Sequence, residues 1–252
     1  MRREGYEITA RFEETHWWFV SRRALFLEQV ARCVERFGQR TPGLRARILD
    51  YGCGTGFNLP FLARFGEVVG ADVAEESLVE FKKEAAYPRI NLRDGAEAHQ
   101  KSFDVVTALD VLEHMEDDVE GLKRVLSFAR PGGDAILTVP AYPWLWSGED
   151  DISRHYRRYT KRSLLKVCDR VGAKVLFLSY FNLSILPIMA GAVWARRLAD
   201  PARARATSNV GEPGRLLNGL LVRVLSFENR QVGRERWRLP AGASLICRLA
   251  RA

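Results

Sequence analysis

The chain has 252 residues, 47% hydrophobic and 28% charged, which suits one α/β domain with additions. Its four cysteines lie far apart, so the sequence argues against a disulfide scaffold and offers no cysteine pair with metal-ligand spacing. The charged N-terminus lacks an apolar core, so we expect no secretory signal and place the protein in the reducing cytoplasm.

Charge is distributed unevenly along the chain. Residues 1–150 hold 19 Lys and Arg against 25 Asp and Glu, whereas residues 151–252 hold 20 against 6. The two parts therefore carry net charges of −6 and +14. We expect the C-terminal part to present a basic face, which suits nucleic acid, anionic lipid or an anionic substrate as a partner.

The N-terminal part predicts a helical segment that packs over the rest of the domain. Aromatic residues are dense from residue 6 to residue 19 and include Trp18. From Val20 to Phe37 apolar residues recur at helical spacing, and a Thr-Pro-Gly stop signal follows. The aromatic segment is either a simple cap on the domain or a lid over a ligand pocket, with Arg22 and Arg23 at its end.

A glycine-rich turn lies between Ile48 and Asp72. Short apolar runs flank it, and helical spacing follows the glycines, which predicts strand, tight turn, helix and strand. Asp72, at the end of the second strand, can accept both hydroxyls of a ribose, which predicts a nucleoside site. Three glycines let the backbone turn sharply and let a ligand lie against the main chain: Gly52, Gly54 and Gly56.

The spacing of this turn separates two classes of nucleoside ligand. A dinucleotide fingerprint needs G-x-G-x-x-G, and Phe57 occupies the place of the third glycine. With Asp50 in front, the pattern is D-x-G-x-G-x-G, which resembles the first motif of class I S-adenosylmethionine-dependent methyltransferases. In that family the loop cradles the methionine part of the cofactor. The resemblance implies S-adenosylmethionine as the cofactor, with Asp50 and the turn glycines in its site.

The resemblance also implies the fold. We expect a doubly wound, seven-stranded, mostly parallel α/β sheet with helices on both faces and an antiparallel last strand. Apolar runs place the strands near residues 48–50, 68–69, 90–92, 103–109, 135–139, 174–181 and 244–249. Helical spacing predicts connecting helices at 75–85, 116–129 and 161–171, the last of them N-capped by Thr160.

Further residues of the cofactor site follow from the same resemblance. Val73 is expected to pack on the adenine face. Asp94 stands where the family has an acidic residue that accepts from the adenine amino group, although it could instead be a turn residue. Trp18 would seat the lid, and Arg22 or Arg23 would pair with the cofactor carboxylate.

The segment LDVLEH follows the fourth predicted strand. Its Asp110, Glu113 and His114 invite interpretation as metal ligands. The segment also resembles the post-strand motif of the family, which lines the methionine side of the pocket without metal. We therefore assign Leu109, Asp110 and His114 to the cofactor site and expect no metal.

Residues 140–159 are expected to cross the mouth of the site, because ligands bind beyond the carboxyl ends of parallel strands. His155 is the candidate general base, since an imidazole titrates near neutral pH. The alternative for His155 is a surface histidine in a basic loop. Aromatic and basic side chains in this segment predict the walls of a substrate pocket: Tyr142, Trp144, Tyr156, Arg158 and Tyr159.

An insertion separates the last two predicted strands. It contains two apolar segments, 183–195 and 216–227, that are framed by arginines. The first segment is too short to cross a bilayer once the sixth strand is assigned, and the second is amphipathic. The insertion is therefore either an interfacial anchor on an anionic bilayer or a pair of helices that cap the sheet or form a dimer interface.

The predicted organisation has three parts: a lid at 1–45, a core at 46–182 plus 240–252, and an inserted helical hairpin at 183–239. We expect methyl transfer from S-adenosylmethionine to a small-molecule, hydrophobic or lipid-linked acceptor, in the cytoplasm or peripherally at the inner face of the membrane. One alternative is an RNA methyltransferase, although no RNA-binding module is recognisable. The other is a non-catalytic cofactor-binding partner of membrane enzymes.

Overall fold

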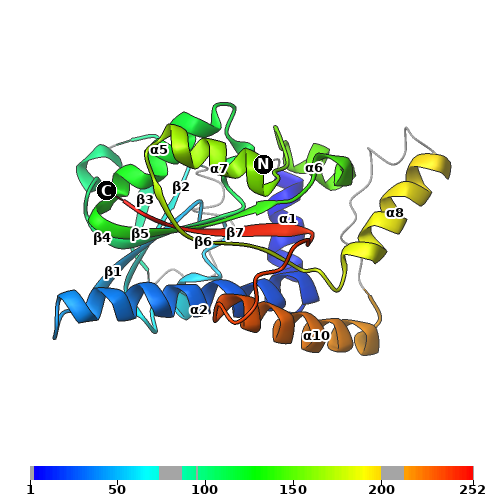
Figure 1. Ribbon diagram of the computed structural model, residues 1–252, viewed down its shortest axis with the longest axis horizontal. Coiled ribbons are helices and arrows are strands. Elements are labelled where there is room, and N and C mark those ends of the chain that lie inside the picture. Colours follow the sequence, from blue (N-terminus) through cyan, green and yellow to red (C-terminus); the bar gives the residue numbers. More distant parts are fainter. Residues whose placement is uncertain (1–2, 74–86, 95, 200–212, 252) are drawn as a thin grey trace.

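A computed structural model describes residues 3–73, 87–94, 96–199 and 213–251 (Figure 1). Its centre is a seven-stranded sheet with the order β3-β2-β1-β4-β5-β7-β6. Strand β7 is antiparallel to both of its neighbours, and the other pairings are parallel, which confirms the predicted fold class. The strands are β1 (Ala46–Tyr51), β2 (Gly66–Asp72), β3 (Arg89–Asn91), β4 (Phe103–Leu109), β5 (Ala129–Pro140), β6 (Lys174–Phe181) and β7 (Ser244–Ala250).

The strand order reverses between β1 and β4, which is where doubly wound sheets have their ligand-binding crevice. Strands β2 and β3 continue from β1 in one direction, and β4 and β5 continue in the other. Ligands of doubly wound sheets bind beyond the carboxyl ends of the strands at such a switch point. The segments after Tyr51 and Leu109 therefore define the place where a ligand can enter.

Helices cover both faces of the sheet (Figure 1). Helices α5 (Asp118–Phe128) and α7 (Lys161–Arg170) lie on one face, where they contact each other and strands β4, β5 and β6. Helix α2 (Trp17–Arg40) crosses the other face beside α10 (Arg215–Gly233). Because both faces are covered, all residues of β4 except Leu109 are buried, which explains why its sequence is largely apolar.

The predicted N-cap of α7 is confirmed, but some of the predicted helix bounds are wrong. Thr160 caps α7 by accepting from the Ser163 backbone N–H at 3.1 Å. The helix expected to begin at Val20 begins at Trp17. It also continues through Gly38 to Arg40, because its packing on the sheet outweighs the weak helix-breaking tendency of this glycine. Helix α3 (Leu59–Leu62) is shorter than expected, since β2 already begins at Gly66. The helix predicted at 75–85 lies outside the described residues.

The insertion forms two helices of different character. Helix α10 packs along α2, and the Gln29 amide donates to the Gly233 carbonyl at 2.6 Å. Helix α8 (Leu186–Ala199) projects from the body at the right of Figure 1, and Val193 is its one buried residue. The Glu228 carboxylate of α10 accepts from the backbone N–H groups of Leu183 and Ser184 at 2.7 and 2.8 Å. This bond pair anchors the start of the insertion to α10.

Two glycines of α10 test how closely it must approach α2. A Cβ at Gly233 would lie 2.7 Å from the Leu25 carbonyl oxygen, whereas a Cβ at Gly219 would meet nothing within 4 Å. We expect Gly233→Ala to lower the free energy of unfolding by about 1–3 kcal/mol through overpacking. Gly219→Ala, the matched control, should raise it by up to about 1 kcal/mol through helix propensity. Thermal denaturation of both variants checks this, and equal melting temperatures would contradict the close packing.

Candidate functional site

The glycine turn after β1 has the backbone that its sequence requires. Gly52, Gly54 and Gly56 all have positive φ, at 77°, 53° and 83°. A Cβ at Gly52 would lie 2.6 Å from Val111 Cγ2, and one at Gly56 would clash with the Arg89 guanidinium. The turn therefore needs glycine for conformation and for space, and it exposes main chain at the end of β1.

Two carboxylates lie beneath this turn. Asp50 is 2% exposed, and its Oδ1 accepts from the Thr107 hydroxyl at 2.7 Å. Burial raises the pKa of Asp50 to about 6, against the hydrogen bond from Thr107 that lowers it. Its Oδ2 has no hydrogen-bond partner among the described residues. Asp72, at the end of β2, accepts from the Gly54 backbone N–H at 2.8 Å, so it stands at the turn as the ribose prediction requires.

Arg22 connects the N-terminal helix to the segment after β4. Its guanidinium forms an ion pair with Asp110 and donates to the Thr138 hydroxyl at 3.0 Å. The same guanidinium lies over the Trp18 ring, 5.1 Å from its centroid. Asp110 has a positive φ of 56°, which is unusual for aspartate, and its backbone N–H donates to the Thr138 carbonyl. Arg22 and Trp18 thus lie at the edge where the methionine part was predicted.

Arg23 has a different environment from its neighbour. Its guanidinium lies over the rings of Phe57 and Phe61, 4.6 and 4.5 Å from their centroids, and donates to the Glu13 carbonyl at 2.7 Å. Burial lowers the pKa of Arg23, although the nearby carboxylate of Glu13 opposes this. Glu13 lies just after α1 (Arg3–Phe12), and its carboxylate accepts from the Thr55 hydroxyl of the glycine turn at 2.6 Å. Arg23 is therefore used to join the N-terminal segment to the turn.

The remaining predicted cofactor residues lie along the carboxyl edge of the sheet. Val73 follows Asp72 and is 43% exposed. Asp94 is exposed after β3, and its carboxylate accepts from the Asn91 side-chain amide at 3.4 Å. Leu109 ends β4 and is half-buried. These positions agree with a nucleoside that runs along the edge, and the individual contacts stay predictions.

The segment after β5 supplies an aromatic wall. Tyr142 stacks on Trp144 and on Tyr180, with ring centroids 5.3 and 5.1 Å apart. Trp144 belongs to the short helix η3 (Pro143–Leu145) and is 41% exposed, and Tyr156 is 54% exposed. These three predicted substrate residues present ring surface to solvent, as a pocket wall requires.

Two other predicted substrate residues are placed differently. Tyr159 is 1% exposed in the core, and its hydroxyl donates to the Asp118 carboxylate at 3.1 Å. Arg158 is also largely buried, and its Nε and Nη2 donate to Asp150 at 2.7 and 2.9 Å. Both side chains are used within the protein, because the segment folds back on α5 and on the short helix α6 (Gly148–Ser153). We therefore remove them from the predicted pocket wall.

Asp150 in turn positions His155. The His155 Nδ1 lies 2.8 Å from Asp150 Oδ1, and Asp150 also accepts from the Ser147 backbone N–H at 2.8 Å. Although burial opposes ionisation, the hydrogen bonds from His155 and Arg158 lower the pKa of Asp150 to about 2. An ionised Asp150 keeps His155 Nδ1 as its hydrogen-bond donor and leaves Nε2 for other partners.

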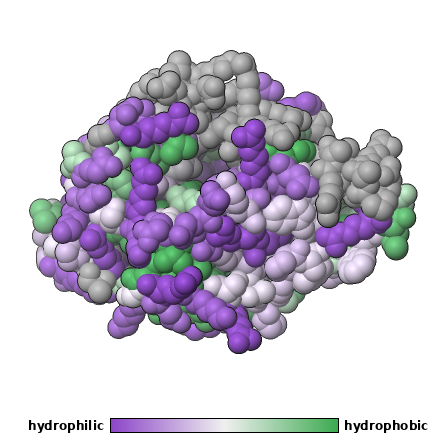
Figure 2. All heavy atoms as spheres, turned by 90° about the horizontal axis from the view of Figure 1, so that it is seen from above, coloured by the Kyte–Doolittle hydropathy of each residue, from purple (hydrophilic) through white to green (hydrophobic). Residues whose placement is uncertain are grey.

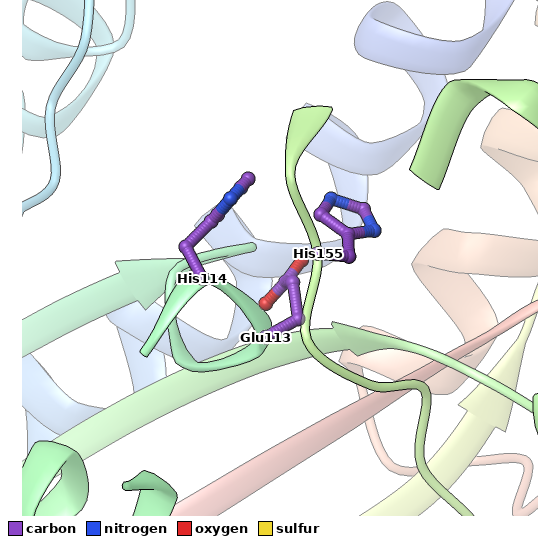
Figure 3. Close-up of side chains that lie close together, drawn as sticks. All are labelled: Glu113, His114 and His155. Atoms are coloured by element: carbon purple, nitrogen blue, oxygen red, sulfur yellow. The ribbon is translucent and has the colours of Figure 1, made fainter. Parts of the chain in front are cut away.

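Glu113 and His114 lie against His155 (Figure 3). They belong to the short helix η2 (Leu112–His114), and the rings of His114 and His155 meet edge to face with centroids 4.6 Å apart. Burial, together with the charge of Asp110, raises the pKa of Glu113 well above its usual value. Burial and His155 lower the pKa of His114 to about 3, so its imidazole is neutral at physiological pH.

The sequence named most members of this site but not their grouping. His114 was assigned to the cofactor and His155 to the acceptor, yet the structure brings them together with Glu113. Asp110, which was grouped with Glu113 and His114, instead pairs with Arg22. Asp150 was missed, because an aspartate in an acidic loop gives no local signal of burial. The grouped side chains can hold a proton or a cation next to the crevice.

Comparison with known proteins places this geometry in a family. A family profile described as "Methyltransferase domain" matches residues 19–178. The solved structure of a methyltransferase from Galdieria sulphuraria superposes with a TM-score of 0.53 at 14% identity, covering 90% of this chain and 86% of that one. At that identity the likeness shows the fold alone.

Curated relatives share part of the chain. A protein of Alkalilimnicola ehrlichii named "Ubiquinone biosynthesis O-methyltransferase" is 34% identical over 122 residues, 45% of this chain and 47% of the relative. A protein of the same name from Hahella chejuensis is 38% identical over 100 residues, 36% of this chain and 42% of the relative. The chain thus spans less than half the length of these relatives. The family profile, by contrast, covers more than half of this chain, and the chain belongs to the class I S-adenosylmethionine-dependent methyltransferases.

Proposed function

We propose that this methyltransferase modifies a hydroxyl of a small, hydrophobic, lipid-linked acceptor and works at the surface of an anionic membrane. The observation that carries the proposal is a set of exposed apolar side chains on α8, on α10 and at Trp237, shortly after α10. We call it the α8–α10 surface, and its exposed members are Ile188, Trp194, Leu198, Leu216, Leu217, Leu220, Val224, Phe227 and Trp237.

The α8–α10 surface has the composition of an interfacial docking face. Leu198 and Leu216 are 82% and 93% exposed, so these apolar side chains do not gain the free energy of burial. Figure 2 shows hydrophobic atoms at the end of the molecule that carries α8, beside a largely hydrophilic face. Exposed arginines surround this surface: Arg196, Arg215, Arg223, Arg230, Arg236 and Arg238.

Apolar groups with an arginine frame match the boundary between acyl chains and anionic headgroups. The two exposed tryptophans, Trp194 and Trp237, suit the level of the headgroups. Within the described residues, no helix is long and apolar enough to cross a membrane. We therefore propose that the protein lies on the bilayer.

The α8–α10 surface adjoins the proposed acceptor pocket. The Arg197 guanidinium of α8 donates to the Trp146 carbonyl at 2.7 Å, directly after the aromatic wall of Tyr142 and Trp144. A membrane-held acceptor would thus approach the wall from the side of α8. The relatives named for ubiquinone biosynthesis by O-methylation support a hydroxyl acceptor and a lipid-linked substrate.

S-adenosylmethionine is the cofactor of the family, and the residues at the crevice fit it. Gly52, Gly54 and Gly56 leave the main chain of the turn without a Cβ at three positions, and beneath it the buried Asp50 Oδ2 has no hydrogen-bond partner among the described residues. We propose that Asp72 holds the ribose, Asp94 the adenine amino group and Arg22 the carboxylate. Bound there, the cofactor would supply a methyl group to the acceptor oxygen, and its sulfur would keep the electron pair of the broken carbon–sulfur bond.

The acceptor hydroxyl must lose its proton before or during transfer. His155 is fixed by Asp150 beside the crevice, and we place it next to this hydroxyl, where it assists proton loss. Tyr142 and Trp144 would hold the acceptor ring or chain by apolar contact. Placing the oxygen in line with the methyl group supplies much of the acceleration.

The proposed function is tested by turnover on a natural mixture. The protein is incubated with cofactor labelled in the methyl group and a bacterial lipid extract. We expect label in the organic phase, in a product from which mild alkali releases no methanol, as for a methyl ether and unlike a methyl ester. Label confined to added RNA, or to water-soluble amines, would contradict the proposal.

Removal of the Asp72 carboxylate should weaken cofactor binding. Loss of a charged acceptor typically costs about 1.5–3 kcal/mol, so Asp72→Ala should raise the dissociation constant by about tenfold or more. Isothermal titration calorimetry measures this, with Glu67→Ala, an exposed carboxylate earlier on β2, as the control. Unaltered affinity in a folded Asp72→Ala protein would remove the ribose assignment.

The role of Arg22 can be separated from its ion pair with Asp110. We expect Arg22→Gln to weaken binding of S-adenosylmethionine about tenfold, because a charge-assisted hydrogen bond to the carboxylate is lost. Decarboxylated S-adenosylmethionine should bind this variant and the wild type equally. The exposed Arg64→Gln serves as the control. If both cofactor forms lose the same affinity, Arg22 acts only through the structure of the site.

Membrane docking should depend on the α8–α10 surface. The triple substitution of Leu198, Leu216 and Leu220 by Ser should abolish flotation with vesicles of anionic phospholipid, because about 0.8 kcal/mol is lost for each CH₂ that is not buried. The control is Leu44→Ser, an exposed leucine (65%) before β1. Flotation should also fall at high salt, since arginines contribute. Equal flotation of both variants, or none of the wild type, would contradict membrane docking.

A further inference from the structure

We infer that Glu113, His114 and His155 form a binding site for one divalent transition-metal ion, for which Zn²⁺ is the best match. Two imidazoles and one carboxylate are a ligand set that Zn²⁺ uses in catalytic sites with an open fourth position. The inference deepens the proposed function and rests on it for the role of the ion, because the open position would face the acceptor hydroxyl.

The first observation is an unpaired buried carboxylate. Glu113 is 0% exposed, and neither of its oxygens has a hydrogen-bond partner in the described part of the chain. A buried carboxylate without any donor is costly, and such groups are ordinarily paired or bound to a metal. His114 Nδ1 is likewise buried without a partner among the described residues. Glu113 and His114 thus both offer ligand atoms whose lone pairs the described protein does not use.

The second observation is the mutual distance of the three groups. One ligand atom from each of Glu113, His114 and His155 lies within 4.8 Å of the others. Ligands about 2.0–2.2 Å from a tetrahedral zinc ion lie roughly 3–4 Å apart. Small rotations of the side chains would therefore close the site. Figure 3 shows the three side chains lying close together on the two segments that carry them.

The third observation is the support of His155. Its Nδ1 is held by Asp150 at 2.8 Å, and Asp150 is itself held by Arg158 and Ser147. A carboxylate on the far nitrogen is the usual arrangement behind a metal-bound histidine, because it fixes the ring and leaves Nε2 for the ion. Two cations near the site, Arg22 and Arg158, are already paired with Asp110 and Asp150.

The two segments that carry the ligands are also joined by main chain. The Tyr156 backbone N–H donates to the Glu113 carbonyl at 2.8 Å, and the His155 backbone N–H donates to the Asp150 carbonyl at 2.8 Å. These backbone hydrogen bonds hold the two ligand-bearing segments in a fixed position relative to each other.

The location gives the ion a task in methyl transfer. Val111, two residues before Glu113, touches the glycine turn at Gly52, so the site borders the predicted methionine side of the crevice. A divalent ion favours ionisation of an oxygen that binds it. The acceptor hydroxyl would release its proton to solvent, and its oxygen would remain as the nucleophile. His155 then assists proton loss as a ligand of the ion and not as a base.

Direct metal binding tests the inference without turnover. The full-length protein is stripped with a chelator, dialysed and titrated with ZnCl₂, with MgCl₂ as the comparison. We expect one Zn²⁺ per chain, and with CoCl₂ the visible absorption of a tetrahedral Co²⁺ site. His114→Ala and His155→Ala should each weaken Zn²⁺ binding by at least about a hundredfold, and Asp150→Asn by about 10–100-fold. His99→Ala, in the short helix η1 (Ala96–His99), is the matched control and should bind as the wild type does.

The outcomes separate the metal site from the proposed function. Failure of the folded wild type to bind Zn²⁺ or Co²⁺ stoichiometrically, or undiminished binding by His114→Ala and His155→Ala, would overturn the site. If the metal-free protein methylates the lipid acceptor and His155→Ala does not, the metal role is wrong and His155 is the base. If Zn²⁺ binds as expected but only amines are methylated, the metal site is supported and the proposed hydroxyl acceptor is wrong.

Discussion

The ion pair between Arg22 and Asp110 is the interaction on which the site depends. It joins α2 on one face of the sheet to the end of β4, and Thr138 of β5 completes the link. Asp110 adopts a left-handed backbone that costs an aspartate about 1–2 kcal/mol. The three contacts offset this cost and turn the chain directly into η2. The direction of Glu113 and His114 follows from that turn.

The distribution of charge at the carboxyl edge follows from the same pairing. Arg22 forms an ion pair with Asp110, and Arg158 forms one with Asp150. Glu113 lies between these two ion pairs, and its carboxylate has no hydrogen-bond partner among the described residues. In a buried environment an uncompensated carboxylate either takes up a proton or attracts a cation. The raised pKa of Glu113 and the inferred metal site are two consequences of one electrostatic arrangement.

The sequence predicts the sheet well because its signals are local. Most of the strands contain a short apolar run, and positive φ at the turn after β1 needs the glycines that the motif contains. The site was predicted less completely, since its contacts join residues that are distant in the chain. Nothing local distinguishes Arg22 from Arg23. Arg22 nevertheless faces Asp110, whereas Arg23 packs over Phe57 and Phe61. The burial of Tyr159 and Arg158 likewise depends on how their segment folds back.

Helix α10 joins the outer surface of the molecule to this interior. Its Leu225 and Val232 are fully buried, while Leu216 and Leu220 face solvent. At its start, Asn218 accepts from the Trp17 backbone N–H and donates to the Thr15 carbonyl, both at 2.9 Å. Trp17 begins the helix that carries Arg22. The apolar surface, the N-terminal segment and the ion pair at the crevice are therefore parts of one packed unit, because α10 cannot shift on α2 without breaking these bonds.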